Sequence, residues 1–127
     1  MAIFTNLTLN TKVYTPAYFR GDTATWMFRG AGVATGFSRL DQRVYQAAKG
    51  KDGKAGAFHS THKMTLPIVS EVDSECSCAG TVLRESGFDV HGWFAPSSTE
   101  AERTDLYLRL VALIATDQFK ETFTKLS

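Results

Sequence analysis

The chain has 127 residues, of which 43% are hydrophobic and 21% are charged, and its formal net charge is +1 at pH 7. This length suits a single domain with its own hydrophobic core, and no apolar run reaches the roughly 18–20 residues that a membrane-spanning helix needs. The first residues lack the basic and apolar blocks of a signal peptide, so we expect synthesis in a cytoplasm and no contact with a membrane.

The first part of the chain predicts β-structure. Alternating apolar and polar residues indicate a strand over residues 3–9, followed by a turn at 10–12 and a short return strand at 13–15. Residues 16–22 are expected to form a connection to a further strand at 23–28. These residues therefore predict an N-terminal hairpin and one more strand beside it.

Two longer strands and a last one follow. Alternation predicts strands over residues 40–48 and 58–66, and the glycine- and lysine-rich residues 50–56 between them predict a hairpin loop. Pro67 fits the end or the edge of a strand, because it has no backbone donor. A final strand is predicted over residues 81–94.

The C-terminal residues predict two helices. Thr99 and Glu102 have the spacing of a capping box at a helix N-terminus. The apolar stripe of the first helix consists of Leu106, Leu110, Leu113 and Ile114. A break at 115–117 separates it from a second, shorter stripe. Each helix therefore has an apolar face that another part of the protein must cover.

Strands followed by helices predict an α+β fold built on an antiparallel sheet. We expect one domain over residues 1–127, in which residues 1–96 form the sheet part and residues 97–127 form a helical dimerisation part. One face of the sheet is expected to be apolar and the other to carry basic side chains. The helices can fold back onto their own sheet or reach the sheet of a partner subunit, and the pattern leaves both arrangements open.

Charge is unevenly distributed along the chain. Residues 39–63 contain six lysine or arginine residues and two aspartates, whereas residues 70–89 are acidic overall. One parity of the two middle strands carries Arg43, Lys49, His59, Thr61 and Lys63. Cations on one surface can neutralise phosphates, while hydroxyl groups fix the register of a bound nucleic acid. The pattern thus predicts an anion-binding face, with an ordinary solvated sheet face as the alternative.

Several segments carry a family resemblance. They are Leu40-Asp41-Gln42-Arg43-Val44, Lys63 with Pro67 at the strand end, the cysteine-bearing loop after it, Ser98-Thr99-Glu100-Ala101-Glu102-Arg103 and Leu110-Val111-Ala112-Leu113-Ile114. In order and spacing they resemble the coat proteins of single-stranded RNA bacteriophages, the leviviruses, most closely those of the Q-beta type. The resemblance implies a hairpin, a larger antiparallel sheet, two helices and an intertwined dimer. It also implies an icosahedral shell whose inner sheet face contacts RNA.

The same resemblance implies a set of RNA-binding positions on the sheet. They fall here on Arg43, Tyr45, Ala47, Lys49, Thr61, Lys63 and Asp89. The family's base-stacking tyrosine falls at Gly87, which cannot stack. Tyr45 lies on the same face and either substitutes for it or has a structural role. Because Ala47 also replaces a small hydroxyl residue, we expect general RNA packaging rather than recognition of the family's known hairpin sequences.

Both cysteines, Cys76 and Cys78, lie in the acidic loop at residues 70–80. Side chains two positions apart in an extended segment are poorly placed to bond to each other without strain. Relatives of the Q-beta type carry two cysteines in this loop that join neighbouring dimers, and the resemblance implies inter-subunit disulfides here at a tighter spacing. Free thiols are the alternative, because a cytoplasm keeps cysteines reduced.

Neither a metal site nor a catalytic centre is predicted. The two cysteines lack the usual spacing of zinc ligands, and parity separates Ser60, His62 and Asp89, which could otherwise be assembled into a catalytic set. The sequence has no glycine-rich phosphate loop and no nucleophile elbow. Trp26 and Trp93 are expected to be buried or to lie in an interface. We therefore expect no cofactor and no enzymatic activity.

The leading interpretation is a structural protein, a phage capsid subunit that dimerises, self-assembles and encloses single-stranded RNA. The resemblance extends to repression of replicase translation through an RNA hairpin. A non-capsid dimeric RNA-binding protein that uses the same basic sheet is the alternative. The expected partners are a second copy of the chain and single-stranded phage RNA. The expected location is the virion, after synthesis and assembly in the bacterial host cytoplasm.

Overall fold

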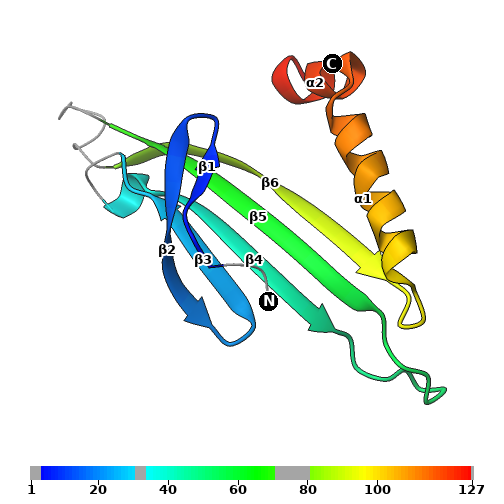
Figure 1. The fold of residues 1–127 in the computed structure, drawn as a ribbon. Coiled ribbons are helices and arrows are strands. Elements are labelled where there is room, and N and C mark those ends of the chain that lie inside the picture. Colours follow the sequence, from blue (N-terminus) through cyan, green and yellow to red (C-terminus); the bar gives the residue numbers. More distant parts are fainter. Residues whose placement is uncertain (1–3, 31–33, 71–80, 127) are drawn as a thin grey trace. The chain divides into compact units, whose positions relative to one another are not determined.

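The structure is a computed structural model and describes residues 4–30, 34–70 and 81–126. The chain divides into two compact units, which we call the sheet unit (Met1–Trp93) and the helical unit (Phe94–Ser127) (Figure 1). The strands precede the helices along the chain, so the predicted α+β class is confirmed.

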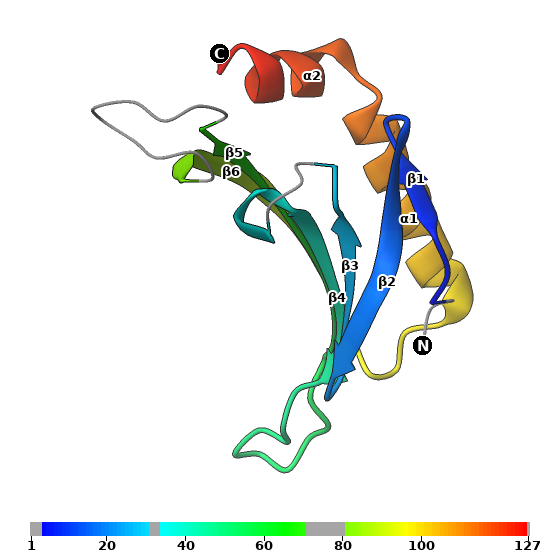
Figure 2. The same ribbon diagram turned by 90° about the vertical axis from the view of Figure 1, so that its left-hand side faces the viewer.

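The sheet unit contains one antiparallel sheet whose six strands lie side by side in sequence order. Antiparallel neighbours need only short connections, which explains this simple order. A short 3-10 turn, η1 (Ala34–Gly36), precedes the fourth strand. Figure 2 shows that the sheet is strongly curved. The strands are β1 (Leu7–Leu9), β2 (Lys12–Arg20), β3 (Thr23–Phe28), β4 (Ser38–Gln46), β5 (Phe58–Val69) and β6 (Val82–Phe94).

A two-residue turn joins β1 to β2. Asn10 and Thr11 have φ angles of 49° and 66°. Both central residues of a type I′ turn adopt positive φ, because that geometry matches the twist of the flanking strands. Asparagine tolerates this conformation, whereas it strains the β-branched threonine. The predicted turn is confirmed but is one residue shorter, since Lys12 already pairs with Leu9.

β2 is longer than the sequence predicts. Residues 16–20, expected to belong to a connection, continue the strand and pair with β3, and only Gly21 and Asp22 form the turn. The register shifts between Pro16 and Tyr18. A bulge of this kind accommodates a proline, which cannot donate to the ladder. The prediction of a connection was therefore wrong, because it treated Pro16 as the end of the strand.

β4 and β5 pair along a long ladder, from the pair Arg39 and Thr65 to the pair Gln46 and Phe58. β4 begins and ends two residues earlier than predicted. β5 runs to Val69, and Pro67 lies beyond its last pair with β4. This position near the end of the strand agrees with the prediction for a residue without a backbone donor.

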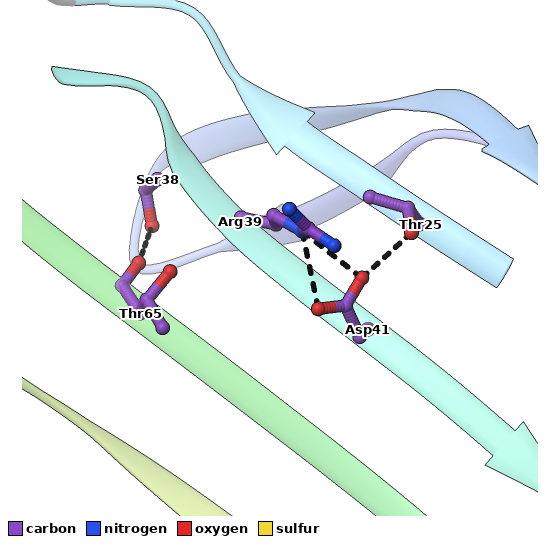
Figure 3. Close-up of polar contacts among 5 residues, drawn as sticks. All are labelled: Thr25, Ser38, Arg39, Asp41 and Thr65. Carbon is purple, nitrogen blue, oxygen red and sulfur yellow. Dashed lines mark hydrogen bonds and ion pairs between the residues drawn. The ribbon is translucent and has the colours of Figure 1, made fainter. Parts of the chain in front are cut away.

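One face of the sheet, which we call the core face, holds the buried core. Trp26 is 1% exposed, as predicted for one of the two tryptophans, and its indole Nε1 donates a hydrogen bond of 2.8 Å to the carbonyl of Thr5. The Tyr14 hydroxyl lies 2.6 Å from the hydroxyl of Ser38. The Ser38 hydroxyl donates at 2.8 Å to the carbonyl of Thr65 (Figure 3). The buried apolar residues are Tyr14, Ala24, Trp26 and Leu40, with Phe4, Leu7, Phe28 and Met64 packed against them.

The helical unit contains α1 (Glu100–Ile114) and α2 (Asp117–Thr124). The predicted capping box is present, because the Glu102 amide donates to Thr99 Oγ1 and the Thr99 amide donates to the Glu102 carboxylate, both at 3.2 Å. Thr116 caps α2 at the predicted break. Neither helix contains a buried residue. In the part of the chain that the structure describes, no helix is both long enough and apolar enough to cross a membrane.

Candidate nucleic-acid interface

The face opposite the core, which we call the open face, is polar. Pairing among β3, β4 and β5 aligns residues in rows across the sheet. Because successive side chains alternate between the two faces, the members of a row share one face. The structure thus brings together Arg43, Thr61 and Lys63, as their shared parity predicts. Two adjacent rows are Thr25, Asp41 and Lys63, and Thr23, Arg43 and Thr61.

A cleft of about 360 Å³ lies on the open face, and we call it the cationic cleft. Four of its lining side chains are cationic and two are carboxylates. Arg20 was not predicted as a site residue, because it lies in the part of β2 that was expected to be a connection. Strict alternation from Tyr14 would have placed Arg20 on the core face, but the register shift between Pro16 and Tyr18 reverses the parity and pairs Arg20 with Thr23 on the open face. The cleft is lined by Tyr18, Arg20, Thr23, Thr25, Arg39, Asp41, Arg43, Thr61, Lys63 and Asp89.

Asp41 neutralises one of the four cations. Arg39 Nε lies 3.2 Å and 3.1 Å from the two oxygens of the carboxylate, and the Thr25 hydroxyl donates to Oδ1 at 2.6 Å (Figure 3). Thr25 is 1% exposed although it lies on the polar face. These contacts join β3 to β4 and satisfy the carboxylate, so Arg39 offers a ligand less free charge than the other cations of the cleft.

Arg43 and Lys63 differ in whether a carboxylate of the described residues pairs with them. Arg43 Nε donates to Asp22 Oδ2 at 2.9 Å, and this hydrogen bond lowers the pKa of the Asp22 carboxyl below its ordinary value by favouring the ionised form. The Arg43 guanidinium also lies 4.0 Å from the centre of the Tyr45 ring. No residue within the described ranges forms an ion pair with Lys63. With respect to these residues, its ammonium group is therefore available to an anion.

Four rings cross β4, β5 and β6 on the open face, and we call them the ring row: Tyr45, His59, His91 and Trp93. Tyr45 and His59 are stacked at 4.9 Å and 9°, and His59 and His91 at 5.0 Å and 28°. His59 Nδ1 lies 2.8 Å from His91 Nε2, so one ring donates a hydrogen bond to the other. His91 meets Trp93 at 6.2 Å and 64°. Only the first two rings were predicted as site residues.

The backbone of β5 explains the glycine in β6. A Cβ atom at Gly87 would overlap the carbonyl oxygen of Met64, so a tyrosine there would require the two strands to separate. Tyr45, the predicted substitute for that tyrosine, already has the Arg43 guanidinium over its ring and His59 stacked against it. A nucleobase could stack on Tyr45 only by displacing one of these neighbours.

The other predicted residues lie outside the cationic cleft and the ring row. Lys49 is exposed in the loop after β4. His62 has the parity of the core face, its Nε2 lies 3.3 Å from the Ser60 hydroxyl, and burial lowers its pKa below the usual value. Among the residues that the structure describes, no three His, Cys, Asp or Glu side chains are grouped as a metal site. Cys76 and Cys78 lie outside the described residues.

The chain is similar to known proteins in family and in fold. The sequence model of a family described as levivirus coat protein matches residues 3–127. No curated protein matches the sequence. A chain of the virus-like particle of bacteriophage NT-214 has a TM-score of 0.82 at 15% identity, covering 99% of this chain and 98% of that chain. A chain of the virus-like particle of Beihai levi-like virus 21 has a TM-score of 0.81 at 16% identity, and the match covers 99% of this chain and 97% of that chain. At these identities the likeness shows the fold alone.

Proposed function

We propose that this chain, which belongs to the levivirus coat protein family, forms an intertwined homodimer, assembles into an icosahedral shell and packages single-stranded RNA against its open face. The family consists of structural capsid proteins and not of enzymes. Synthesis and assembly in the bacterial cytoplasm, before release in the virion, belong to the same proposal. The observation that carries RNA packaging is the cationic cleft, which gathers four cations from β2, β4 and β5 on one surface.

An apolar surface on each of the two units supports the dimer. On the core face, Val44, Phe58 and Leu66 are 58%, 41% and 48% exposed, although they share the parity of the buried Leu40. On α1 the exposed fractions run from 37% to 53% for Leu106, Leu110, Leu113 and Ile114. Apolar surface left in water costs roughly 25 cal/mol per Å². Helices of one subunit laid over the sheet of the other would cover both surfaces, and this is the intertwined arrangement.

The charges of the cationic cleft support RNA packaging. Within the described ranges Lys63 and Arg20 have no carboxylate partner, and Arg43 shares its charge with one exposed carboxylate. Cations concentrated in a concave surface attract phosphates, and hydroxyl groups such as that of Thr61 hydrogen-bond to phosphate or sugar oxygens. The proposed RNA-binding set is Arg43, Tyr45, Lys49, His59, Thr61, Lys63 and Asp89.

Repression of replicase translation through an RNA hairpin is a narrower proposal. Gly87 and Ala47 lack the side-chain groups that the family resemblance assigns to hairpin recognition. General RNA packaging is therefore the main proposal, ahead of recognition of a specific hairpin. Cross-linking of neighbouring dimers through Cys76 and Cys78 is also proposed, and non-reducing electrophoresis of assembled particles, with and without dithiothreitol, is its test.

Expression of the full chain alone in bacteria tests the function. We expect particles of uniform size by electron microscopy, formed without any other phage protein, and RNA inside them that nuclease cannot reach. A protein that binds RNA but elutes only as a dimer would overturn the assembly part and favour the non-capsid alternative. Uniform particles that contain no RNA would overturn the packaging part.

Asp22→Asn should strengthen RNA binding. The substitution removes the carboxylate that holds Arg43 at 2.9 Å, so the guanidinium becomes free to contact a phosphate. We expect a lower Kd for a single-stranded oligoribonucleotide and a salt dependence steeper by about 0.7 in log Kd per log unit of salt concentration. Fluorescence anisotropy titrations at several salt concentrations measure both quantities.

Asp105→Asn is the matched control. Asp105 pairs with Arg109 at 3.1 Å on α1, and this ion pair is also exposed. The control changes the net charge equally but frees an arginine in the helical unit, so RNA affinity should stay the same. Equal strengthening by both substitutions would show that only net charge matters. No effect of Asp22→Asn would show that Arg43 does not contact a phosphate.

A further inference from the structure

The inner rings of the ring row present no free stacking face. His59 lies between Tyr45 on β4 and His91 on β6, and both neighbours stack against it. Tyr45 has His59 at 4.9 Å and the Arg43 guanidinium at 4.0 Å from its ring centre. The row is also held by the hydrogen bond of 2.8 Å between the two histidines. An incoming ring therefore finds room only at the Trp93 end.

Trp93 differs from its neighbours in both exposure and geometry. Its side chain is 69% exposed, and among the described residues no Phe, Tyr or Trp is more exposed. His91 meets the indole at an interplanar angle of 64°, so the imidazole does not lie flat on the indole face. Trp93 is thus not buried within the sheet unit. The indole therefore offers an aromatic face at the end of a row of stacked rings, and an aromatic face of this kind can stack on a nucleobase.

We propose that Trp93 stacks on an unpaired base of the single-stranded RNA bound on the open face, an inference that rests on the proposed packaging function. Asp89, which lines the cationic cleft, and Trp93 share one parity of β6 and are four residues apart, or about 13 Å along an extended strand. One oligonucleotide can therefore reach both. Its phosphates meet the cations of the cleft while one base covers the indole.

An unpaired base is the occupant that the surroundings favour. Every base has a π-face, so stacking on an aromatic side chain tolerates any sequence and suits general packaging. The rings beside Trp93 are polar imidazoles, and the cleft on the same face is cationic. These surroundings suit a base with polar edges on an anionic backbone better than an apolar protein surface. The preformed row also limits the side-chain entropy lost on binding.

Tryptophan fluorescence of the full chain provides the direct test. The protein has two tryptophans, and Trp26 is 1% exposed, so quenching by acrylamide reports on Trp93. The probes are a single-stranded oligoribonucleotide of about eight residues and an oligomer of equal length that has the ribose-phosphate backbone without bases. We expect the first probe to quench the emission of Trp93 and protect it from acrylamide, and the second to bind without either effect.

Substitutions of Trp93 separate stacking from charge. Trp93→Leu should weaken binding of the base-containing oligomer by about tenfold or more. The salt dependence and the affinity for the abasic oligomer should stay the same, because the substitution leaves every phosphate contact in place. Trp93→Phe should keep most of the affinity. Circular dichroism and size-exclusion chromatography establish that the variants remain folded. If Trp93→Leu does not fold, the affinity of Trp93→Phe and the fluorescence of the unaltered chain decide whether Trp93 stacks on a base.

Two results would overturn the stacking role. One is an unchanged affinity of folded Trp93→Leu for the base-containing oligomer. The other is emission of Trp93 that is already shielded from acrylamide in RNA-free protein, because a second copy of the chain would then cover the indole. If stacking fails in this way while removal of Lys63 still weakens binding, the packaging function stands. If neither oligomer binds, both proposals fail.

Discussion

Leu110→Asp is expected to abolish the soluble dimer and the particle with it. Leu110 is 37% exposed in a single chain, the lowest value in the apolar stripe of α1. In the proposed dimer the partner's sheet covers it, and an unpaired buried carboxylate costs on the order of 3–5 kcal/mol. A monomer would leave its apolar surfaces in water, so we expect unfolded or aggregated protein. Size-exclusion chromatography and circular dichroism of the soluble fraction measure the outcome.

Two control substitutions accompany Leu110→Asp. Leu110→Met keeps the position apolar, and Thr104→Asp introduces the same charge on α1 outside the apolar stripe. Both variants should still form dimers and particles. A folded, soluble monomer of Leu110→Asp would contradict the intertwined dimer. Dimers that survive the substitution would show that the interface lies elsewhere.

Replacing Arg43 and Lys63 together with alanine should reduce the RNA inside the particles. For each phosphate that the protein no longer binds, the salt dependence of RNA binding should flatten by about 0.7 in log Kd per log unit of salt concentration. Lys63→Ala alone should have a larger effect than Arg43→Ala alone, because Arg43 already shares its charge with Asp22. The ratio of absorbance at 260 nm to that at 280 nm measures the packaged RNA, and anisotropy titrations measure the salt dependence.

Two control substitutions test whether RNA binding depends on the cationic cleft or on positive charge anywhere on the protein. Lys63→Arg keeps the cation and should keep most of the packaged RNA. Arg109→Ala removes an exposed arginine from α1, where it pairs with Asp105, and should change neither quantity. If the double variant packages as much RNA as the unaltered chain, with the same salt dependence, another surface must bind the RNA.

The amino-acid sequence by itself determined the local structure and the faces of the sheet. A capping box requires only Thr99 and Glu102 at the right spacing, so its prediction needed no knowledge of the rest of the fold. Side chains alternate with a period of two along a strand, so parity alone placed Arg43, Thr61 and Lys63 on one face. These predictions hold because the deciding interactions are short-range, between residues near each other in the chain or across one hairpin.

Only the tertiary structure decided how far β2 extends. Residues 16–22 read as a connection, because proline interrupts regular hydrogen bonding. Pairing with β3 continues on the far side of a bulge, and this pairing brings Arg20 to the cationic cleft. A bulge depends on the partner strand, and the residues of β2 alone do not reveal it.

Only the tertiary structure also decided which charges and rings of the open face remain free for a ligand. Arg43 and Asp22 are 21 residues apart in the chain, and His59 and His91 are 32 residues apart, yet each pair is in hydrogen-bond contact. These contacts leave Trp93 as the open end of the ring row. Ion pairs and ring stacks need separations of a few ångströms between different strands. Strand order and register set those separations, and no local sequence pattern contains them.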